Sequence, residues 1–307
     1  MKFRSDPSSI RGSIAPLVTP FAEDGSVDLP TVTRLIEWQL ENGTHGISVG
    51  GSTGEPGAQT VEERISIMET AAAAIDDRVP FFPGTGTAKL DETFELTAAA
   101  QRLGADMALV ISPYYARPQQ QGIFEWYDAI AREFPDMPIV VYNVPVRTAV
   151  DIAPETVARL AKAHDNIVGI NETTRDFEHV SHVLDLCGRD FLAYCGIELL
   201  CYPTLCLGGV GHLSTVANVA PRPVAELYDA FAAGDHERAR ELHYELSPLV
   251  ELAFLETNPV PGKWAMKELG ILESDRVRPP LAQMSDISRD RARKLLASVR
   301  AASYSSG

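Results

Sequence analysis

Eight short apolar runs, rich in β-branched residues, recur along this 307-residue chain and alternate with amphipathic helical segments. Strands and helices that alternate in this way indicate βαβ units and a parallel sheet. Eight such units in a chain of this length favour a closed (β/α)8 TIM barrel, an α/β fold, over a doubly wound sheet. The predicted strands are Ser13–Thr19, Gly46–Val49, Val79–Pro83, Met107–Ile111, Pro138–Tyr142, Ile167–Ile170, Phe191–Cys195 and Gly211–Ser214.

Helical patterns fill the intervals between these runs and also the end of the chain. After about Gly234 the strand pattern stops and only helical segments follow. We therefore expect a barrel over residues 1–233, with its active site at the carboxyl ends of the strands. A C-terminal helical region, residues 234–307, is expected to pack on the barrel. The clearest predicted helices are Asp28–Glu41, Val61–Ile75, Asp91–Arg102, Gly122–Phe134 and Pro154–His164. Those predicted in the C-terminal region are Asp235–Leu255, Pro261–Leu269 and Ser288–Val299.

The chain is acidic, with a formal net charge of -15 from 42 acids and 27 bases. Phosphate groups bind basic surfaces, so this balance argues against nucleic acid and anionic membrane as partners. No apolar run is long enough to span a bilayer, and the first residues lack the apolar core of a signal peptide. We therefore expect a cytoplasmic protein. No carboxylate–histidine cluster follows a predicted strand, so we expect no metal and no cofactor.

A glycine–hydroxyl loop, Gly50–Gly51–Ser52–Thr53–Gly54–Glu55, follows the second predicted strand. In a barrel, functional side chains gather at the carboxyl ends of the strands and in the loops after them. Backbone N–H groups exposed by glycine, together with two hydroxyls, can hold a small carboxylate without a full positive charge. A glycine-rich turn that only caps the next helix is the alternative. The loop lacks the Gly-Lys-Ser/Thr of a P-loop, which argues against nucleotide binding.

Further side chains suited to chemistry follow the fourth and fifth predicted strands. Tyr142 can donate, accept or shuttle a proton if a neighbouring group lowers the cost of its ionisation. A core tyrosine with a satisfied hydroxyl is the alternative. Arg147 is suited to a substrate carboxylate, through a bidentate contact. Tyr114 and Tyr115 are candidates for a wall, a lid or a subunit contact.

Four motifs occur together in the order and spacing of one family. The chain resembles the pyruvate-dependent class I aldolases typified by dihydrodipicolinate synthase (4-hydroxy-tetrahydrodipicolinate synthase) and N-acetylneuraminate lyase. The resemblance runs from about Gly12 to Met284 and is closest in type to dihydrodipicolinate synthase. The motifs are Gly50–Gly51–Ser52–Thr53–Gly54–Glu55, Ser112–Pro113–Tyr114–Tyr115, Tyr142–Asn143–Val144–Pro145–x–Arg147–Thr148 and Val168–Gly169–Ile170–x–Glu172.

This resemblance implies a TIM barrel and a lyase that joins pyruvate to an aldehyde bearing a carboxylate, or releases it, through a lysine Schiff base. It also implies a homotetramer built as a dimer of dimers. Ser52 and Thr53 correspond to the hydroxyl pair that binds the pyruvate carboxylate, and Ser52 also belongs to a proton relay. Tyr142 corresponds to the tyrosine that shuttles protons. Tyr115 corresponds to the relay tyrosine that a neighbouring subunit contributes.

The resemblance places the remaining site positions as well. Arg147 corresponds to the arginine that holds the carboxylate of the aldehyde, and Gly196 and the backbone of Leu213 match positions that line the pocket. In feedback-inhibited synthases, histidine-type ligands for lysine lie a few residues after the glycine–hydroxyl loop. Gln59–Thr60–Val61 occupies that region here, so we expect no feedback by lysine.

Asn171 is the departure from the family pattern. It stands where the family has the lysine that forms the imine with pyruvate. Imine formation needs a deprotonatable amine, and the amide of asparagine cannot replace it. Among the other lysines only Lys89 lies near the end of a predicted strand, and near-attack geometry tolerates little displacement. We therefore expect this chain to be an inactive or ligand-trapping form of the enzyme.

Asn171 has two possible origins, an engineered substitution that stops turnover or a natural paralogue that lost imine chemistry. The otherwise intact set of site residues, which includes Tyr142 and Arg147, favours the first. Two other functions are alternatives. One is a non-catalytic protein that binds 2-oxo acids. The other is a hydratase or lyase that uses Tyr142 and Ser52 without an imine.

Overall fold

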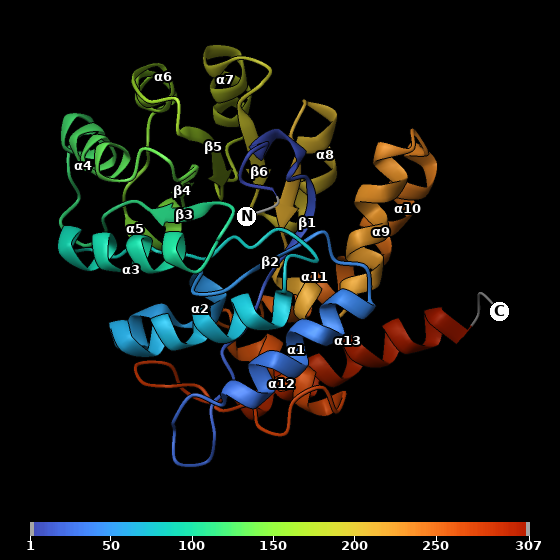
Figure 1. The fold of residues 1–307 in the computed structure, drawn as a ribbon. Coiled ribbons are helices and arrows are strands. Elements are labelled where there is room, and N and C mark those ends of the chain that lie inside the picture. Colours follow the sequence, from blue (N-terminus) through green and yellow to red (C-terminus); the bar gives the residue numbers. More distant parts are fainter. Residues whose placement is uncertain (1–2, 305–307) are drawn as a thin grey trace.

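Parallel strands form the centre of the fold, and helices are arranged around them in the computed structural model (Figure 1). The structure describes residues 3–304, so the ends of the two predicted regions, residues 1–2 and 305–307, lie outside it. Within that range seven strands are hydrogen-bonded in the order β2-β1-β7-β6-β5-β4-β3. They are β1 Gly12–Pro16, β2 Gly46–Ser48, β3 Ala108–Ile111, β4 Ile139–Asn143, β5 Ile167–Glu172, β6 Leu192–Cys195 and β7 Gly211–Leu213.

The segment predicted as the third strand, Val79–Pro83, lies between β2 and β3 but is not a continuous strand. Phe81 forms a parallel bridge to β2, and Gly84 forms a parallel bridge to β3. Pro80 and Pro83 have no N–H group to donate, so the hydrogen-bond ladder is interrupted along this segment. The bridges nevertheless join the two edges of the seven-stranded sheet. The result is a TIM-barrel-like fold.

Each of the eight predicted helical segments is largely helical in the structure, which also has helices outside those segments. Thr60 and Glu63 form a capping box at the start of α2. The single helix predicted over Asp235–Leu255 is divided into two, because Pro248 in the first turn of the second helix cannot continue the first. The helices are α1 Leu29–Glu41, α2 Val61–Ile75, α3 Leu90–Arg102, α4 Gln120–Glu133, α5 Pro145–Thr148, α6 Pro154–Ala163, α7 Phe177–Cys187, α8 Cys201–Cys206, α9 Pro221–Ala232, α10 His236–Glu245, α11 Ser247–Ala253, α12 Val260–Glu268 and α13 Asp286–Tyr304.

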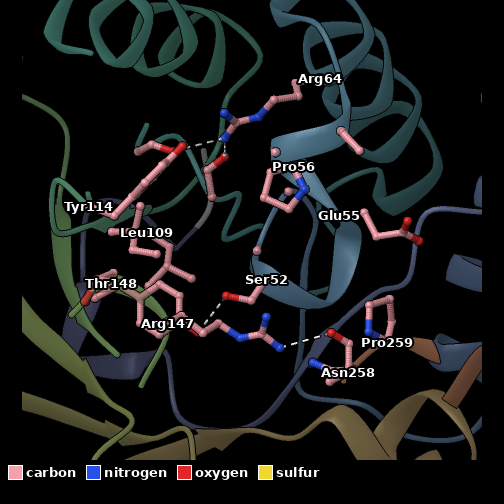
Figure 2. A pocket seen from close by; sticks show the side chains of 18 of the residues that line it. Ser52, Glu55, Pro56, Arg64, Leu109, Tyr114, Arg147, Thr148, Asn258 and Pro259 are labelled. Carbon is pink, nitrogen blue, oxygen red and sulfur yellow. Dashed lines mark hydrogen bonds between the residues drawn. The ribbon is translucent and has the colours of Figure 1, made fainter. Parts of the chain in front are cut away.

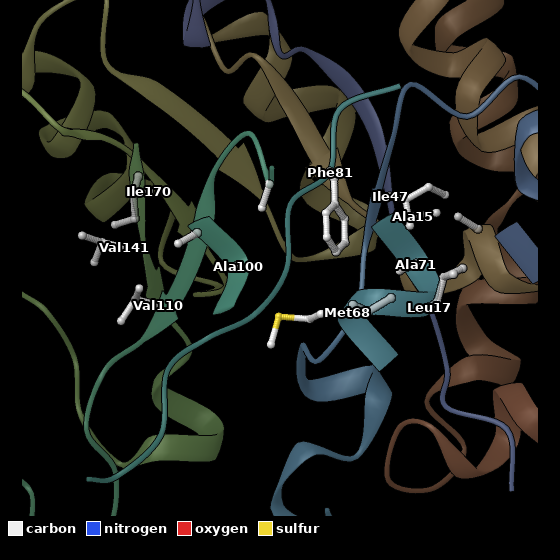
Figure 3. Packing of buried hydrophobic residues seen from close by; sticks show 14 of the residues in the cluster. Ala15, Leu17, Ile47, Met68, Ala71, Phe81, Ala100, Val110, Val141 and Ile170 are labelled. Atoms are coloured by element: carbon white, nitrogen blue, oxygen red, sulfur yellow. The ribbon is translucent and has the colours of Figure 1, made fainter. Parts of the chain in front are cut away.

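Alternation along the strands divides the buried apolar side chains into two layers. Ile14, Leu109, Val140 and Tyr142 belong to the layer inside the barrel. Their neighbours in sequence, such as Ala15, Val110 and Val141, belong to the layer between strands and helices, as does Ile170 of β5 (Figure 3). Successive side chains of a strand point to opposite faces. Ile170 points outward, so Asn171 points into the barrel.

The C-terminal helices share a core with the barrel. Leu242 of α10, Leu249 of α11 and Trp264 of α12 belong to the same buried cluster as the outer layer of the strands. The boundary at residue 234 stays a prediction. Of the helices within residues 3–304, none combines the length and apolar character needed to cross a bilayer.

Candidate active site

A cavity of about 800 Å³ opens at the carboxyl ends of the strands, and we call it the strand-end cavity. A neighbouring side cavity of about 340 Å³ shares Ser52, Tyr142 and Arg147 with it and is also lined by Arg64 and Tyr114 (Figure 2). The strand-end cavity brings together every residue to which the family resemblance assigns a place in the site, except Tyr115. Those residues are Ser52, Thr53, Tyr142, Arg147, Asn171, Gly196 and Leu213.

Ser52 and Tyr142 meet in this cavity. Ser52 begins a 3-10 turn after β2, and Tyr142 lies near the end of β4. Their hydroxyl oxygens are 3.1 Å apart, which is hydrogen-bond distance. Burial raises the pKa of Tyr142, while Ser52, Arg147 and Thr173 act in the opposite direction. At neutral pH the phenol is therefore protonated and can donate a hydrogen bond to a ligand.

Asn258 connects the hydroxyl loop with Arg147. Its side-chain amide donates to Thr53 Oγ1 at 3.0 Å. Its backbone carbonyl accepts a hydrogen bond from Arg147 Nη2 at 3.0 Å (Figure 2). Thr215 Oγ1 also lies 3.3 Å from Thr53 Oγ1. Sequence reasoning missed both residues. Asn258 precedes α12 and follows no strand, so nothing in the sequence around it indicates a site residue. Thr215 comes shortly after β7, so the tendency of site residues to follow barrel strands could have identified it.

Asn171 lies on the inner face of β5, between Tyr142 of β4 and Tyr194 of β6 in the strand register. Its side chain lines the strand-end cavity, and the residue is only 2% exposed. Asn171 Oδ1 has no hydrogen-bond partner among the described residues. A buried acceptor of this kind needs a donor from a ligand or water. Asn171 is therefore available to a bound molecule.

Gly196 is held close to Asn171 by the neighbouring strand. Its N–H donates to the Glu172 carbonyl at 2.8 Å. A Cβ atom at Gly196 would overlap the Thr173 hydroxyl and lie 3.1 Å from Asn171 Oδ1. Only glycine fits here without a shift of these side chains. Leu213 of β7, 7% exposed, completes the apolar wall of the cavity.

Tyr115 does not line either cavity of its own chain. It lies in the loop after β3, 95% exposed, with a φ of 72° in the left-handed region. That backbone conformation is uncommon for a residue with a Cβ atom. The expectation that Tyr115 serves a neighbouring subunit, and the homotetramer itself, stay predictions.

No lysine within residues 3–304 lines the strand-end cavity. Lys89 pairs with Glu92 at 2.7 Å, and its side chain is 69% exposed. Lys263 of α12 is fully buried and bonds Glu55 and the Arg276 carbonyl. Burial, opposed by Glu55, lowers the pKa of Lys263 to about 8. Its nitrogen is thus committed to structural contacts. Over the same residues no group of three or more His, Cys, Asp or Glu is placed to hold a metal ion.

A buried acid–base pair lies behind Asn171. Glu172, the next residue of β5, accepts a hydrogen bond from Asn143 Nδ2 at 2.9 Å and lies 3.2 Å from His179 Nδ1 of α7. Burial raises the pKa of Glu172. Burial lowers the pKa of His179, but the carboxylate of Glu172 beside it outweighs this effect and brings that pKa to about 9. The pair ties α7 to the strand that carries Asn171.

We expect this pair to make stability depend on pH. The folded-state pKa of His179 lies above its unfolded value of about 6.5. Its stabilising contribution is therefore complete below about pH 6.5 and is lost as the pH rises through about 9, on the order of 2 kcal/mol. Urea unfolding at both ends of this window, for the chain and for His179→Gln, measures the effect. An equal pH dependence in the two proteins would show that the pair contributes nothing.

The comparison with known proteins agrees with the motifs. The chain matches the profile of the Dihydrodipicolinate synthetase family over residues 9–299. It belongs to this family. It is 45% identical over 285 residues to a 4-hydroxy-tetrahydrodipicolinate synthase from Thermus thermophilus, covering 93% of this chain and 95% of that protein. The synthase of that name from Syntrophobacter fumaroxidans is 43% identical, covering 92% and 97%.

Solved structures give the same result for the fold. Dihydrodipicolinate synthase from Aquifex aeolicus is 40% identical with a TM-score of 0.91, covering 94% of this chain and 98% of that one. The 4-hydroxy-tetrahydrodipicolinate synthase from Methylacidiphilum fumariolicum has a TM-score of 0.92 at 36% identity, covering 95% and 96%. The resemblance to the dihydrodipicolinate synthetase family inferred from four motifs is thus confirmed. The roles assigned to single residues and the consequence of Asn171 stay predictions.

Proposed function

We propose that this chain is a dihydrodipicolinate synthase-type protein that binds pyruvate or a related 2-oxo acid but does not form the imine. One observation carries the proposal. Asn171, buried with a free amide oxygen, lines the same cavity as the Ser52–Tyr142 pair. The relatives named 4-hydroxy-tetrahydrodipicolinate synthase support the type of chemistry. The proposal includes the homotetramer that the resemblance implies.

The cavity offers a separate group to each part of the ligand. The Ser52 and Thr53 hydroxyls suit the carboxylate of the 2-oxo acid, with Thr53 oriented by Asn258. The protonated Tyr142 suits the keto oxygen, next to Asn171 in the strand register. Arg147 suits the carboxylate of the aldehyde partner. With lysine at position 171, these groups would serve a pyruvate-dependent carbon–carbon lyase.

Imine-independent enolisation is less well supported by the same site. Removing a methyl proton from a 2-oxo acid needs a base and a group that accepts the developing charge. Burial raises the pKa of Tyr142, which makes its phenolate a costly base. No amine within the described residues lines the cavity to act as an electron sink. Binding without turnover therefore fits this chain better than a hydratase does.

Calorimetry with pyruvate tests the proposal on the chain as it stands. We expect saturable binding of one pyruvate per chain, without consumption of pyruvate in the presence of an aldehyde. Ser52→Ala and Thr53→Val remove the hydroxyls proposed to hold the carboxylate, so the double variant is expected to lose about tenfold or more in affinity. Binding of equal strength by the double variant, or no binding by the parent chain, would exclude this site.

A further inference from the structure

Two arginines lie at the mouth of the strand-end cavity, although only one was anticipated. Arg147 belongs to α5, after β4, and Arg175 lies between β5 and α7. The strands β4 and β5 are hydrogen-bonded neighbours. Both arginines are exposed to solvent and both line the cavity. The mouth therefore carries two cationic side chains in a chain with a net charge of -15.

Arg175 has no hydrogen bond or ion pair within the described residues, and both the acid next to it in sequence and the acid in the cavity lining have other partners. The carboxylate of Asp176, its neighbour in sequence, accepts the N–H groups of Glu178 and His179 at the start of α7. Glu256, which also lines the cavity, accepts both the N–H and the hydroxyl of Ser285. The guanidinium of Arg175 is thus free to meet a ligand.

Arg147 is oriented differently. Its Nη2 donates to the Asn258 carbonyl, and Asn258 in turn contacts the hydroxyl loop. This contact fixes one side of the Arg147 guanidinium. Its remaining N–H groups can bind a second carboxylate of the ligand, next to the 2-oxo acid group. Arg175 extends the positively charged mouth from the end of β4 to the end of β5. An acidic protein that admits an anionic substrate needs such local positive charge.

We infer that Arg175 is a specificity-determining residue for a ligand with three carboxylates. This rests on the proposed function. One carboxylate belongs to the 2-oxo acid at Ser52 and Thr53, the second contacts Arg147 and the third contacts Arg175. The substrate class is then an aldol of a 2-oxo acid with a carbonyl partner that itself bears two carboxylates. A partner with one carboxylate would leave Arg175 unused.

Two aldols that differ at one substituent test this assignment. In 4-hydroxy-4-methyl-2-oxoglutarate a methyl group stands where 4-carboxy-4-hydroxy-2-oxoadipate has a carboxymethyl group, so the second probe adds one carboxylate. Calorimetry with the chain as it stands compares their affinities. We expect the tricarboxylate to bind about tenfold more tightly, the effect of one charge-assisted contact.

Variants separate a specific contact from a general effect of charge. Arg175→Gln is expected to abolish the tenfold preference and to leave binding of the dicarboxylate unchanged. Arg189→Gln is the matched control, because Arg189 is an exposed arginine beyond the opposite end of α7 and does not line the cavity. Arg189→Gln also removes one positive charge, but it is expected to retain the tenfold tighter binding of the tricarboxylate. Arg147→Gln is expected to weaken both probes.

The outcomes distinguish this inference from the proposed function. If pyruvate and both probes fail to bind the parent chain, the proposed function is wrong and the assignment of Arg175 fails with it. If pyruvate and the dicarboxylate bind but the tricarboxylate gains nothing, only the assignment of Arg175 is wrong. The same holds if Arg175→Gln keeps the preference, or weakens both probes equally.

Discussion

Replacing Asn171 by lysine is expected to convert this chain into an active pyruvate-dependent lyase. Position 171 is buried on the inner face of β5, next to Tyr142 and open to a cavity of about 800 Å³, so a longer side chain has room to extend. The lysine would supply the nucleophile and the electron sink that the amide lacks. Loss of a covalent nucleophile costs several orders of magnitude in rate, so we expect a gain on the order of 10³-fold or more.

The measurement is the rate of pyruvate consumption with an aldehyde that bears a carboxylate, before and after Asn171→Lys. Asn171→Met is the matched control, because methionine is similar in length but has no amine. It should stay at the level of the parent chain. Equal rates for the lysine and methionine variants would contradict the account. They would show that the cavity is not arranged for imine chemistry.

Removing the Tyr142 hydroxyl in the Asn171→Lys protein is expected to have the second largest effect. Tyr142 Oη lies 3.1 Å from Ser52 Oγ, and Tyr142 lines the strand-end cavity in which we propose that the keto oxygen binds. A proton donor or shuttle in this position contributes about 10²- to 10⁴-fold. We expect Tyr142→Phe to lower kcat by that factor and to change pyruvate affinity much less. Steady-state kinetics across pH measures both parameters.

Tyr127→Phe is the control for this substitution. Tyr127 is fully buried, and its hydroxyl donates to the Val110 carbonyl at 2.9 Å, but it lines neither cavity. Its loss is expected to lower stability by about 1 kcal/mol and to leave kcat unchanged. A similar fall in kcat in both variants would mean that Tyr142 acts through stability and not through proton transfer.

The centre of the site could be predicted from the sequence because it follows the strands. Alternation along β4 and β5 places Tyr142 and Asn171 on the inner face, and the parallel arrangement gathers their ends at one edge. The glycine–hydroxyl loop after β2 is therefore expected at the same end of the barrel as Tyr142. The hydrogen bond between Ser52 and Tyr142 agrees with this. These inferences need only the period of a strand and the geometry of a barrel.

Other parts of the site depend on long-range packing, which has no local pattern. Asn258 contacts Thr53 from a loop that lies 205 residues further along the chain. Arg175 precedes the N-cap of α7 in a polar loop, and its sequence context does not distinguish it from an ordinary residue at the start of a helix. The segment Val79–Pro83 has the apolar pattern of a strand, but its prolines remove the donors of a continuous ladder. Tyr115 is 95% exposed and lines neither cavity of its own chain, so its predicted role depends on a neighbouring subunit.

The most direct test of the account is to trap the imine itself. Borohydride reduces an imine to a stable amine, so intact-mass spectrometry after treatment with pyruvate and borohydride shows whether pyruvate has become covalently attached. We expect no adduct on the parent chain and one pyruvate-derived adduct per chain, located at position 171, on the Asn171→Lys protein. An adduct on the parent chain would show that another amine, such as that of Lys263 or Lys89, performs the chemistry. No adduct on the lysine variant would contradict the claim that this cavity is an aldolase site that lacks only its amine.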